Sequence, residues 1–296
     1  MQDLRFGVIT IQSKPWAVLV QHWKKTEELG FDSLWIADHF CDYNQPTHPF
    51  FEGWTTLTGL AGVTHKIRIG TLVTTISLRH PAVLARQALT LDHISNGRLN
   101  LGIGAGAPSS EGEIVYDMIG IDDWKASERV AHFKEQIEII DLLLRERVSS
   151  YSGKYYQLKD VGMNPPPIQN PGPPITIGGI RRKMIKIAVK YADTWNSYGG
   201  INLNPKEMYE SIKKQVEFAE DYCKELGRNL STLRQSHLTY GQEVQTLYDS
   251  EDNFLKYIEK YEELGFSEFI LFYPWDKKQM VVFEKIAKEI IPDLKS

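Results

Sequence analysis

The sequence has few cysteines, no long apolar run and little net charge, and each of these scarcities excludes a class of protein. Its two cysteines, Cys41 and Cys223, lie far apart, so neither a disulfide framework nor a cysteine-based zinc site is expected. No apolar run approaches the length of a membrane-spanning helix. The 34 basic residues nearly balance the 38 acidic ones, which argues against a nucleic-acid or membrane-surface partner.

The start of the chain shows no targeting signal. Met1-Gln2-Asp3 leads directly into a strand-like segment, without the charged region and apolar core of a signal peptide. Together with the scarcity of cysteine, this predicts a cytoplasmic protein. Hydrophobic residues make up 42% of the chain, so it can bury a large core, and we expect one barrel domain over residues 1–296.

The segment from Lys66 to Ala107 is typical of one β-α-β unit. Its first part, Ile67 to Val73, is a short β-branched and apolar run that predicts a buried strand. Pro81 begins a helix, and Asn96-Gly97 ends it. The second run, Arg98 to Gly104, predicts another strand with glycines at 102, 104 and 106. Because those glycines stand where the strand leaves the sheet, the backbone there can approach a ligand closely.

The alternation of strand and helix continues along the whole chain. Eight helical segments follow eight predicted strands, which are Leu4 to Thr10, Ser33 to Asp38, Ile67 to Val73, Arg98 to Gly104, Ile175 to Gly178, Thr194 to Tyr198, Arg234 to Tyr240 and Glu268 to Tyr273. The α/β alternation favours a parallel sheet, and eight repeats favour closure into a (β/α)8 (TIM) barrel. A doubly wound open sheet is the alternative, although it more often has five or six strands.

One excursion interrupts this alternation before strand five, at about 149–174. Its YSGKYY sequence predicts a small hairpin with Ser-Gly at the turn, and the proline-rich NPPPIQNPGPP follows.

A barrel of this kind carries its chemistry at the C-terminal ends of its strands, which makes Asp38-His39 the strongest candidate pair. Histidine exchanges protons near neutral pH, and a neighbouring carboxylate can orient its ring or raise its pKa. The alternative is that Asp38 caps a loop while His39 only bonds to the backbone.

Gly178-Gly179 and the basic run Arg181-Arg182-Lys183 form a second candidate. Free backbone N–H groups at a helix N-terminus suit a phosphate, and the cations add to that attraction. A tight turn followed by a solvated basic face is the alternative interpretation. The glycines of strand four lack the G-x-G-x-x-G spacing of a dinucleotide site.

The aromatic stretch around Glu52 is a weaker candidate. Glu52 lies among aromatics and is a candidate for a raised pKa, although a residue of this kind more often starts a helix. Tyr43, Phe50 and Trp54 suit the wall of an apolar pocket, but core packing explains them equally well. No third ligand accompanies His39 and His48, so no metal site is expected.

Three segments resemble the bacterial-luciferase-like monooxygenase superfamily. They are GFDSLWIADHF (Gly30 to Phe40), IRIGTLVTTISLRHPAVLARQALTLDHISNGRLNLGIGAG (Ile67 to Gly106) and PPITIGGIRRKMIKIAVKYADTWN (Pro173 to Asn196). YSGKYYQL with the following PPP is similar to the family's linker before strand five. The resemblance implies a (β/α)8 barrel that binds a flavin or deazaflavin, and it implies a homodimer.

Asp-His-Phe after strand two is more similar to the branch that uses the deazaflavin coenzyme F420. The resemblance puts Asp38 and His39 beside the hydride-transferring carbon, with His39 as the proton acceptor or donor. It puts Tyr43 near the ring, and it places a strand-three bulge with a non-proline cis peptide at Leu72-Val73. Where some deazaflavin sugar-phosphate dehydrogenases have a catalytic glutamate, this chain has Ala107, which counts against their chemistry.

The resemblance also implies which residues hold the coenzyme. The ring and ribityl chain would lie against Thr71, Leu72, Val73 and Thr74 and against Gly104, Ala105, Gly106 and Ala107, and the phosphate against Ile177, Gly178, Gly179, Arg181 and Arg182. Apart from the resemblance, the residues themselves make Phe50, Glu52 and Trp54 candidates for the substrate pocket.

The leading hypothesis is therefore F420-dependent hydride transfer to or from a small organic substrate. One alternative is a monooxygenase that uses reduced FMN and oxygen. Another, of a different class, is a coenzyme-binding protein without turnover. A glycoside hydrolase has little support, because Asp38 has no evident carboxylate partner.

Overall fold

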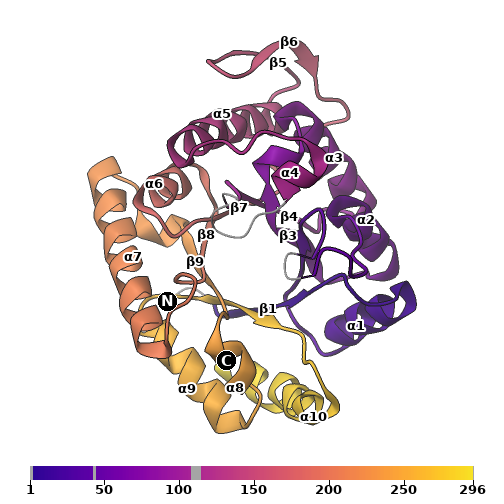
Figure 1. The fold of residues 1–296 in the computed structure, drawn as a ribbon, viewed down its shortest axis with the longest axis vertical. Coiled ribbons are helices and arrows are strands. Elements are labelled where there is room, and N and C mark those ends of the chain that lie inside the picture. The colour runs from indigo at the N-terminus through magenta and orange to yellow at the C-terminus, as the bar shows by residue number, and fades with distance from the viewer. Residues whose placement is uncertain (1–2, 43–44, 108–114, 296) are drawn as a thin grey trace.

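The computed structural model describes residues 3–42, 45–107 and 115–295, and within them eight parallel strands close into a barrel (Figure 1). Around the barrel the order is β1-β10-β9-β8-β7-β4-β3-β2. The strands are β1 (Arg5–Thr10), β2 (Ser33–Asp38), β3 (Arg68–Thr75), β4 (Leu99–Gly104), β7 (Ile175–Gly178), β8 (Thr194–Ser197), β9 (Arg234–Leu238) and β10 (Glu268–Phe272). The predicted (β/α)8 barrel is confirmed.

Helices surround the strands and cover their outer faces. The longer ones are α1 (Trp16–Glu28), α2 (Gly53–Val63), α3 (Pro81–Ile94), α5 (Ala126–Arg145), α6 (Arg182–Tyr191), α7 (Pro205–Leu226), α9 (Glu251–Glu262) and α10 (Lys277–Lys285). Sequence patterning did not predict the short α4 (Val115–Ile119) and α8 (Gln242–Thr246), which offer too few residues for a helical period. The chain ends in α11 (Ile291–Leu294). Among the helices described, none is long and apolar enough to cross a membrane.

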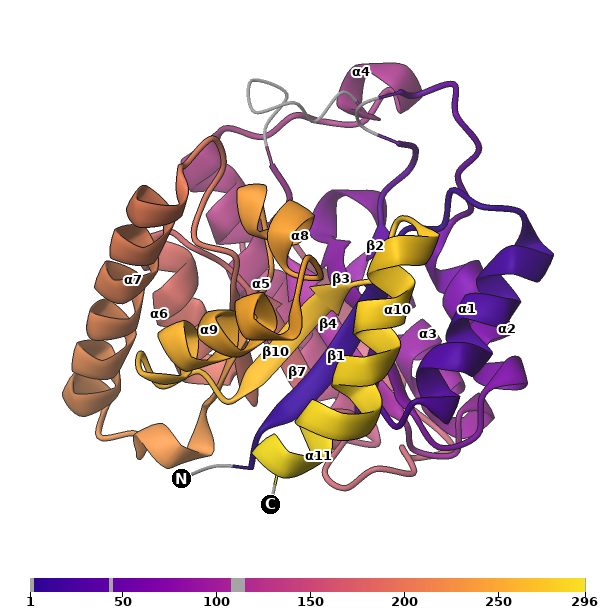
Figure 2. The same cartoon turned by 90° about the horizontal axis from the view of Figure 1, so that it is seen from below.

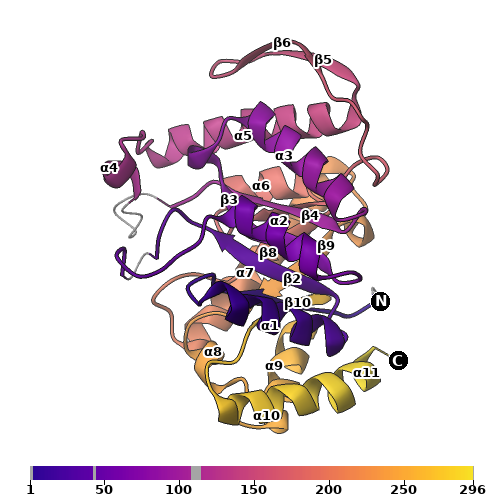
Figure 3. The same cartoon turned by 90° about the vertical axis from the view of Figure 1, so that its right-hand side faces the viewer.

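The excursion before β7 is a two-stranded antiparallel hairpin that projects beyond the helices (Figure 3). It consists of β5 (Val148–Ser152) and β6 (Gln157–Gly162), as the YSGKYY sequence predicts. Glu135 on α5 fixes its turn, because the carboxylate accepts hydrogen bonds from the backbone N–H groups of Lys154, Tyr155 and Tyr156. The hairpin is therefore attached to the outer helical layer and leaves the barrel order unchanged.

Trp35 is the largest side chain of a small apolar cluster inside the barrel. The Trp35 ring packs against Ile9, Leu72 and Ile270, and its indole N–H donates to Ser33 Oγ at 2.8 Å. Glycines surround it: a Cβ added at Gly7 would lie 2.9 Å from Trp35 Nε1, and one at Gly70 would lie 2.6 Å from its ring. This plug separates the two ends of the barrel, so each end can hold its own chemistry.

His237 is a buried titratable group between the barrel and α9. It is 0% exposed, its Nδ1 lies 3.0 Å from the Ser197 carbonyl oxygen, and its ring packs on Tyr261. Burial lowers the pKa of His237 to about 3, and the bond to Ser197 opposes this only in part. Below pH 6.5 the unfolded chain therefore binds a proton that the folded chain rejects, and stability falls as the pH falls.

We predict that His237→Phe makes the free energy of unfolding less sensitive to acid. One proton of linkage amounts to about 1.4 kcal/mol per pH unit, so His237 removes roughly 2 kcal/mol between pH 7.5 and pH 5. Urea unfolding of both proteins at the two pH values measures the difference. At pH 7.5 the imidazole is neutral in both states, so that comparison isolates the cost of changed packing. If the change from pH 7.5 to pH 5 lowers the free energy of unfolding equally in both proteins, the prediction is contradicted.

Candidate active site

The C-terminal ends of the strands meet at one end of the barrel, here called the mouth. Figure 2 shows the mouth at the top, beneath α4, and both chain termini at the opposite end. His39 directly follows β2, Gly104 ends β4, and Gly178 ends β7. The structure thus brings the predicted segments 38–39, 71–74, 104–107 and 177–182 to the same end. Tyr43 lies outside the described residues.

Asp38 is buried at the tip of β2 and is ion-paired with Arg79. Both guanidinium Nη atoms bond to the carboxylate, with Arg79 Nη2 3.0 Å from Asp38 Oδ1 and Nη1 on Oδ2. Burial raises the pKa of Asp38, while Arg79 acts against that rise. Sequence reasoning missed Arg79, although it stands in the connection between β3 and α3, and so at the mouth.

Glu52 is the N-cap of α2. Its carboxylate accepts from the backbone N–H groups of Trp54 and Thr55 at 3.1 and 2.7 Å and also binds Arg79. Burial by itself would raise the pKa of Glu52, but these hydrogen bonds and Arg79 outweigh it, so the pKa lies below its usual value. The expectation of a raised pKa was wrong, and the alternative, a residue that starts a helix, is correct.

The aromatic side chains near Glu52 have different environments. Trp54 is buried in the core, and its indole N–H donates to Thr74 Oγ1 at 3.0 Å, so core packing accounts for it. Phe50 is half-buried, and its ring centroid lies 6.5 Å from that of His39. Of this group, Phe50 is the residue that the structure places beside the predicted catalytic histidine.

The His39 imidazole is kept neutral by burial. Burial lowers the pKa of His39 to about 4, and the charge of Asp42 opposes this only in part. Of the two effects that a neighbouring carboxylate can have, a raised pKa of His39 is not found, because the Asp38 carboxylate is paired with Arg79. At neutral pH the ring can therefore donate one hydrogen bond and accept another.

Strand β3 bulges where it reaches the mouth. Its pairing with β4 shifts register between Gly70 and Thr74, and the Leu72-Val73 peptide bond is cis, as the resemblance implies. A Cβ added at Gly104 would lie 2.4 Å from Val73 Cγ2, and one at Gly178 would lie 3.0 Å from Val73 Cγ1. The glycines that we interpreted as space for a ligand thus also make room for β3 itself.

The tip of β4 and the start of α6 complete this end of the barrel. Gly106 adopts a positive φ of 73°, and the Tyr116 hydroxyl donates to the Ala107 carbonyl at 2.8 Å. After Gly178-Gly179, helix α6 begins beside three exposed cations, Arg181 to Lys183, with no acidic residue in its first turn. The Arg182 guanidinium lies over the Phe218 ring at 5.0 Å. Backbone N–H groups and cations at this position fit an anionic group such as a phosphate.

Metal-ligating side chains do not cluster in the part of the chain that the structure describes. Among the residues that the structure describes, no three His, Cys, Asp or Glu side chains gather in a way that could hold a metal ion. The chemistry available here is that of a neutral imidazole, an ion-paired carboxylate and an electropositive helix start.

Comparisons with known proteins give relatives for this arrangement. The F420-dependent glucose-6-phosphate dehydrogenase of Amycolatopsis mediterranei is 30% identical over 218 residues, which are 72% of this chain and 63% of that protein. The 5,10-methylenetetrahydromethanopterin reductase of Archaeoglobus fulgidus is 30% identical over 219 residues, 72% of this chain and 58% of that protein. The matches thus cover less than two thirds of either relative.

Solved structures share the fold over nearly the whole chain. An F420-dependent secondary alcohol dehydrogenase, in complex with an F420-acetone adduct, superposes with a TM-score of 0.81 at 19% identity and covers 97% of this chain and 100% of its own. The model of the family described as luciferase-like monooxygenase matches residues 4–228. These residues include β1 to β8 and every mouth residue discussed above, and the chain therefore belongs to the luciferase-like monooxygenase family.

Proposed function

We propose that this protein is an F420-dependent oxidoreductase that transfers a hydride to or from a small organic substrate. The observation that carries the proposal is the convergence at one barrel end of a neutral imidazole, a bulged strand and a cationic helix start. The first supplies a proton-exchanging group, the second a surface for a flat ring, and the third a place for a phosphate. When bound, the deazaflavin coenzyme supplies the hydride acceptor or donor.

The choice of F420 over FMN is supported by the relatives. Of two relatives that are 30% identical, one is named as an F420-dependent glucose-6-phosphate dehydrogenase. The other is named as a 5,10-methylenetetrahydromethanopterin reductase. The alternative, an FMN-dependent monooxygenase, is supported by the name of the family itself. The sugar-phosphate activity does not follow, since Ala107 stands where a catalytic glutamate is expected. The expected homodimer stays a prediction.

The residues of the chain have separate tasks in this proposal. His39 accepts a proton from the substrate oxygen as hydride leaves the neighbouring carbon, because its ring is neutral, and in the reverse reaction the protonated ring returns that proton. Arg79 is a positioning residue: through Asp38 and Glu52 it ties the tip of β2 to the start of α2. The bulge of β3 and the glycines of β4 and β7 would hold the coenzyme ring.

The coenzyme choice predicts selective binding. Titration of the pure protein with F420 and, separately, with FMN should show the tighter dissociation constant for F420. Fluorescence of the free coenzymes measures both. Tight binding of FMN alone, together with oxygen consumption when a flavin reductase is added, would support the monooxygenase instead.

We predict that replacing His39 lowers turnover without weakening coenzyme binding. His39→Gln should lower kcat by about 100-fold or more, the usual contribution of a general acid or base, and should leave F420 affinity nearly unchanged. Bleaching of the oxidised coenzyme, followed across a panel of small alcohols, measures the rate. His48→Gln is the matched control, because His48 is an exposed histidine of the same loop. Full activity of His39→Gln would exclude the proposed proton transfer.

We predict that replacing Arg79 lowers the free energy of unfolding and that a second substitution, at Asp38, restores part of it. Arg79→Met leaves the buried Asp38 without its counter-charge, and breaking such a pair costs about 3–5 kcal/mol. Adding Asp38→Asn removes the charge that Arg79 neutralised, so the double variant should recover part of that loss. Urea unfolding measures both. If the double variant is no more stable than Arg79→Met, then the ion pair is not what holds the tip of β2.

A further inference from the structure

Three neighbouring strands of the barrel, β10, β9 and β8, carry apolar side chains into the mouth. Because inward-facing positions alternate along a strand, Phe272 of β10 and Leu238 of β9 stand at the last inward positions before these strands end. Both side chains pack on the apolar cluster around Trp35, yet both remain partly exposed. They therefore form an apolar layer above that cluster.

Aromatic rings extend this layer outward. The Trp275 side chain is 61% exposed, and its ring stacks on that of Phe272 with the centroids 5.8 Å apart. Tyr198 directly follows β8, and its partly exposed ring lies 4.9 Å from that of Tyr240, beyond the end of β9. These five residues, with Leu238, are here called the apolar arc. Exposed apolar side chains that gather at the chemical end of a barrel indicate a binding surface.

The charged residues that come first after β9 and β10 are already engaged. Glu243 binds Lys260 Nζ at 2.7 Å and accepts a hydrogen bond from the Tyr261 hydroxyl at 2.8 Å. Asp276 caps α10, because its Oδ1 accepts from the Gln279 backbone N–H at 2.9 Å. The arc itself contains no charged residue, so its polar groups are the two tyrosine hydroxyls.

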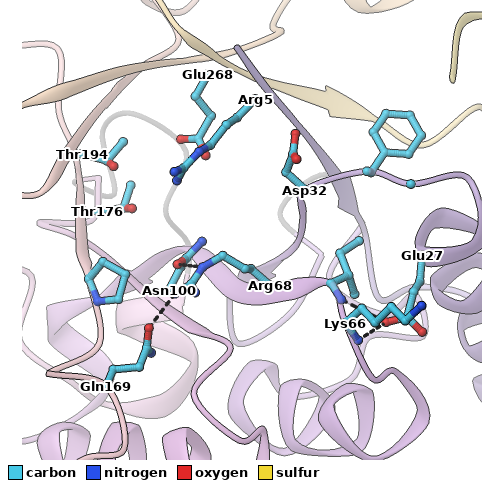
Figure 4. A pocket seen from close by; sticks show the side chains of 14 residues that line it. Arg5, Glu27, Asp32, Lys66, Arg68, Asn100, Gln169, Thr176, Thr194 and Glu268 are labelled. Carbon is cyan, nitrogen blue, oxygen red and sulfur yellow. Dashed lines mark hydrogen bonds between the residues drawn. The ribbon is translucent and has the colours of Figure 1, made fainter. Parts of the chain in front are cut away.

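The same strands are polar at the other end of the barrel. There a cavity of about 670 Å³ is bordered by Thr194 of β8 and Glu268 of β10, which stand four positions before Tyr198 and Phe272 (Figure 4). Cations and carboxylates both line this cavity, among them Arg5. The inner face of β8 and β10 thus changes from polar to apolar toward the mouth, which indicates that the mouth is adapted to an apolar ligand.

The arc adjoins both the coenzyme strands and the predicted catalytic histidine. In the barrel order, β10-β9-β8 is followed by β7-β4-β3, which carry the residues assigned to the coenzyme (Figure 1). On the other side only β1 separates β10 from β2, where His39 stands at the tip. A molecule held on the arc is therefore bordered by the coenzyme on one side and by His39 on the other.

We propose that the substrate is an uncharged alcohol or carbonyl compound with an aromatic or bulky aliphatic group, which the apolar arc binds. This inference rests on the redox function proposed above and narrows it to one substrate class. In the oxidative direction the C–H bond of the carbinol breaks, and its hydrogen leaves with both electrons for the oxidised deazaflavin. The hydroxyl proton passes to His39, and a C=O double bond forms. A carboxylate or phosphate on the arc loses its hydration and finds no counter-charge, so charged substrates are disfavoured.

Three alcohols of the form CH3–CH(OH)–R test the substrate class on the F420-loaded protein. The group R is a carboxylate in lactate, a methyl in 2-propanol and a phenyl in 1-phenylethanol. We expect kcat/KM to rise in that order, and to rise about fourfold for each methylene added from 2-propanol to 2-pentanol, the usual gain from burying one. Bleaching of the coenzyme measures the rates. A preference for lactate, or equal rates with all three, overturns the inference.

Binding of acetophenone, the ketone formed from 1-phenylethanol, gives a readout that needs no turnover. Isothermal titration measures it with and without F420. Phe272→Ala should weaken binding roughly tenfold, the upper range for an aromatic pair. Trp275→Ala should weaken it severalfold and removes little packing, because that side chain is exposed. Leu255→Ala is the matched control, since it removes an exposed apolar side chain from the outer helix α9.

The two measurements separate this inference from the proposed function. Failure of F420 to bind contradicts the redox function, and acetophenone titration without coenzyme still tests the arc. Weaker acetophenone binding in both arc variants, with Leu255→Ala like the parent, supports the arc as the substrate surface. If acetophenone does not bind, or if the arc variants bind it as the parent does, then the arc only completes the barrel core and the inference is overturned.

Discussion

The structure depends on how the interior of its barrel is filled. Trp35 shares the barrel interior with the branched side chains of Ile9, Leu72 and Ile270, and its ring fits because Gly7 and Gly70 offer no Cβ to collide with it. A small barrel cannot tolerate a void, so the single large ring and the small residues around it require each other. The result is a solid partition with a distinct chemical environment at each end.

At the mouth, electrostatic pairing decides which groups are available for chemistry. Arg79 engages both Asp38 and Glu52, so two carboxylates that are prominent in the sequence serve to hold β2 and α2 together. His39 is left with a neutral ring, because burial outweighs the one nearby negative charge that acts on its pKa. At the opposite end, by contrast, the Arg5 guanidinium forms no hydrogen bond or ion pair with the described residues.

The order of the strands, the hairpin and the strand-end position of the site were predictable from local patterns. These patterns each extend over a few residues: the strand-like runs, the helix start at Pro81 and the YSGKYY turn. The folded chain contains all three. Arg79 was not found, because its partners are 41 and 27 residues away along the chain. Raised pKa values were considered for Glu52 and His39, and both pKa values instead lie below their usual range, because burial and hydrogen bonding are properties of the folded site.

The sequence by itself determined the alternation of elements, the barrel and the family, since periodicity and short motifs are encoded by neighbouring residues. Only the tertiary structure decided what the glycines of β4 and β7 accommodate. Val73 lies against Gly104 and Gly178 because a register shift brings three strands together, and no spacing along the chain reveals that contact. Tertiary structure likewise decided which charges are paired, because ion pairing depends on distances between side chains that are remote in sequence.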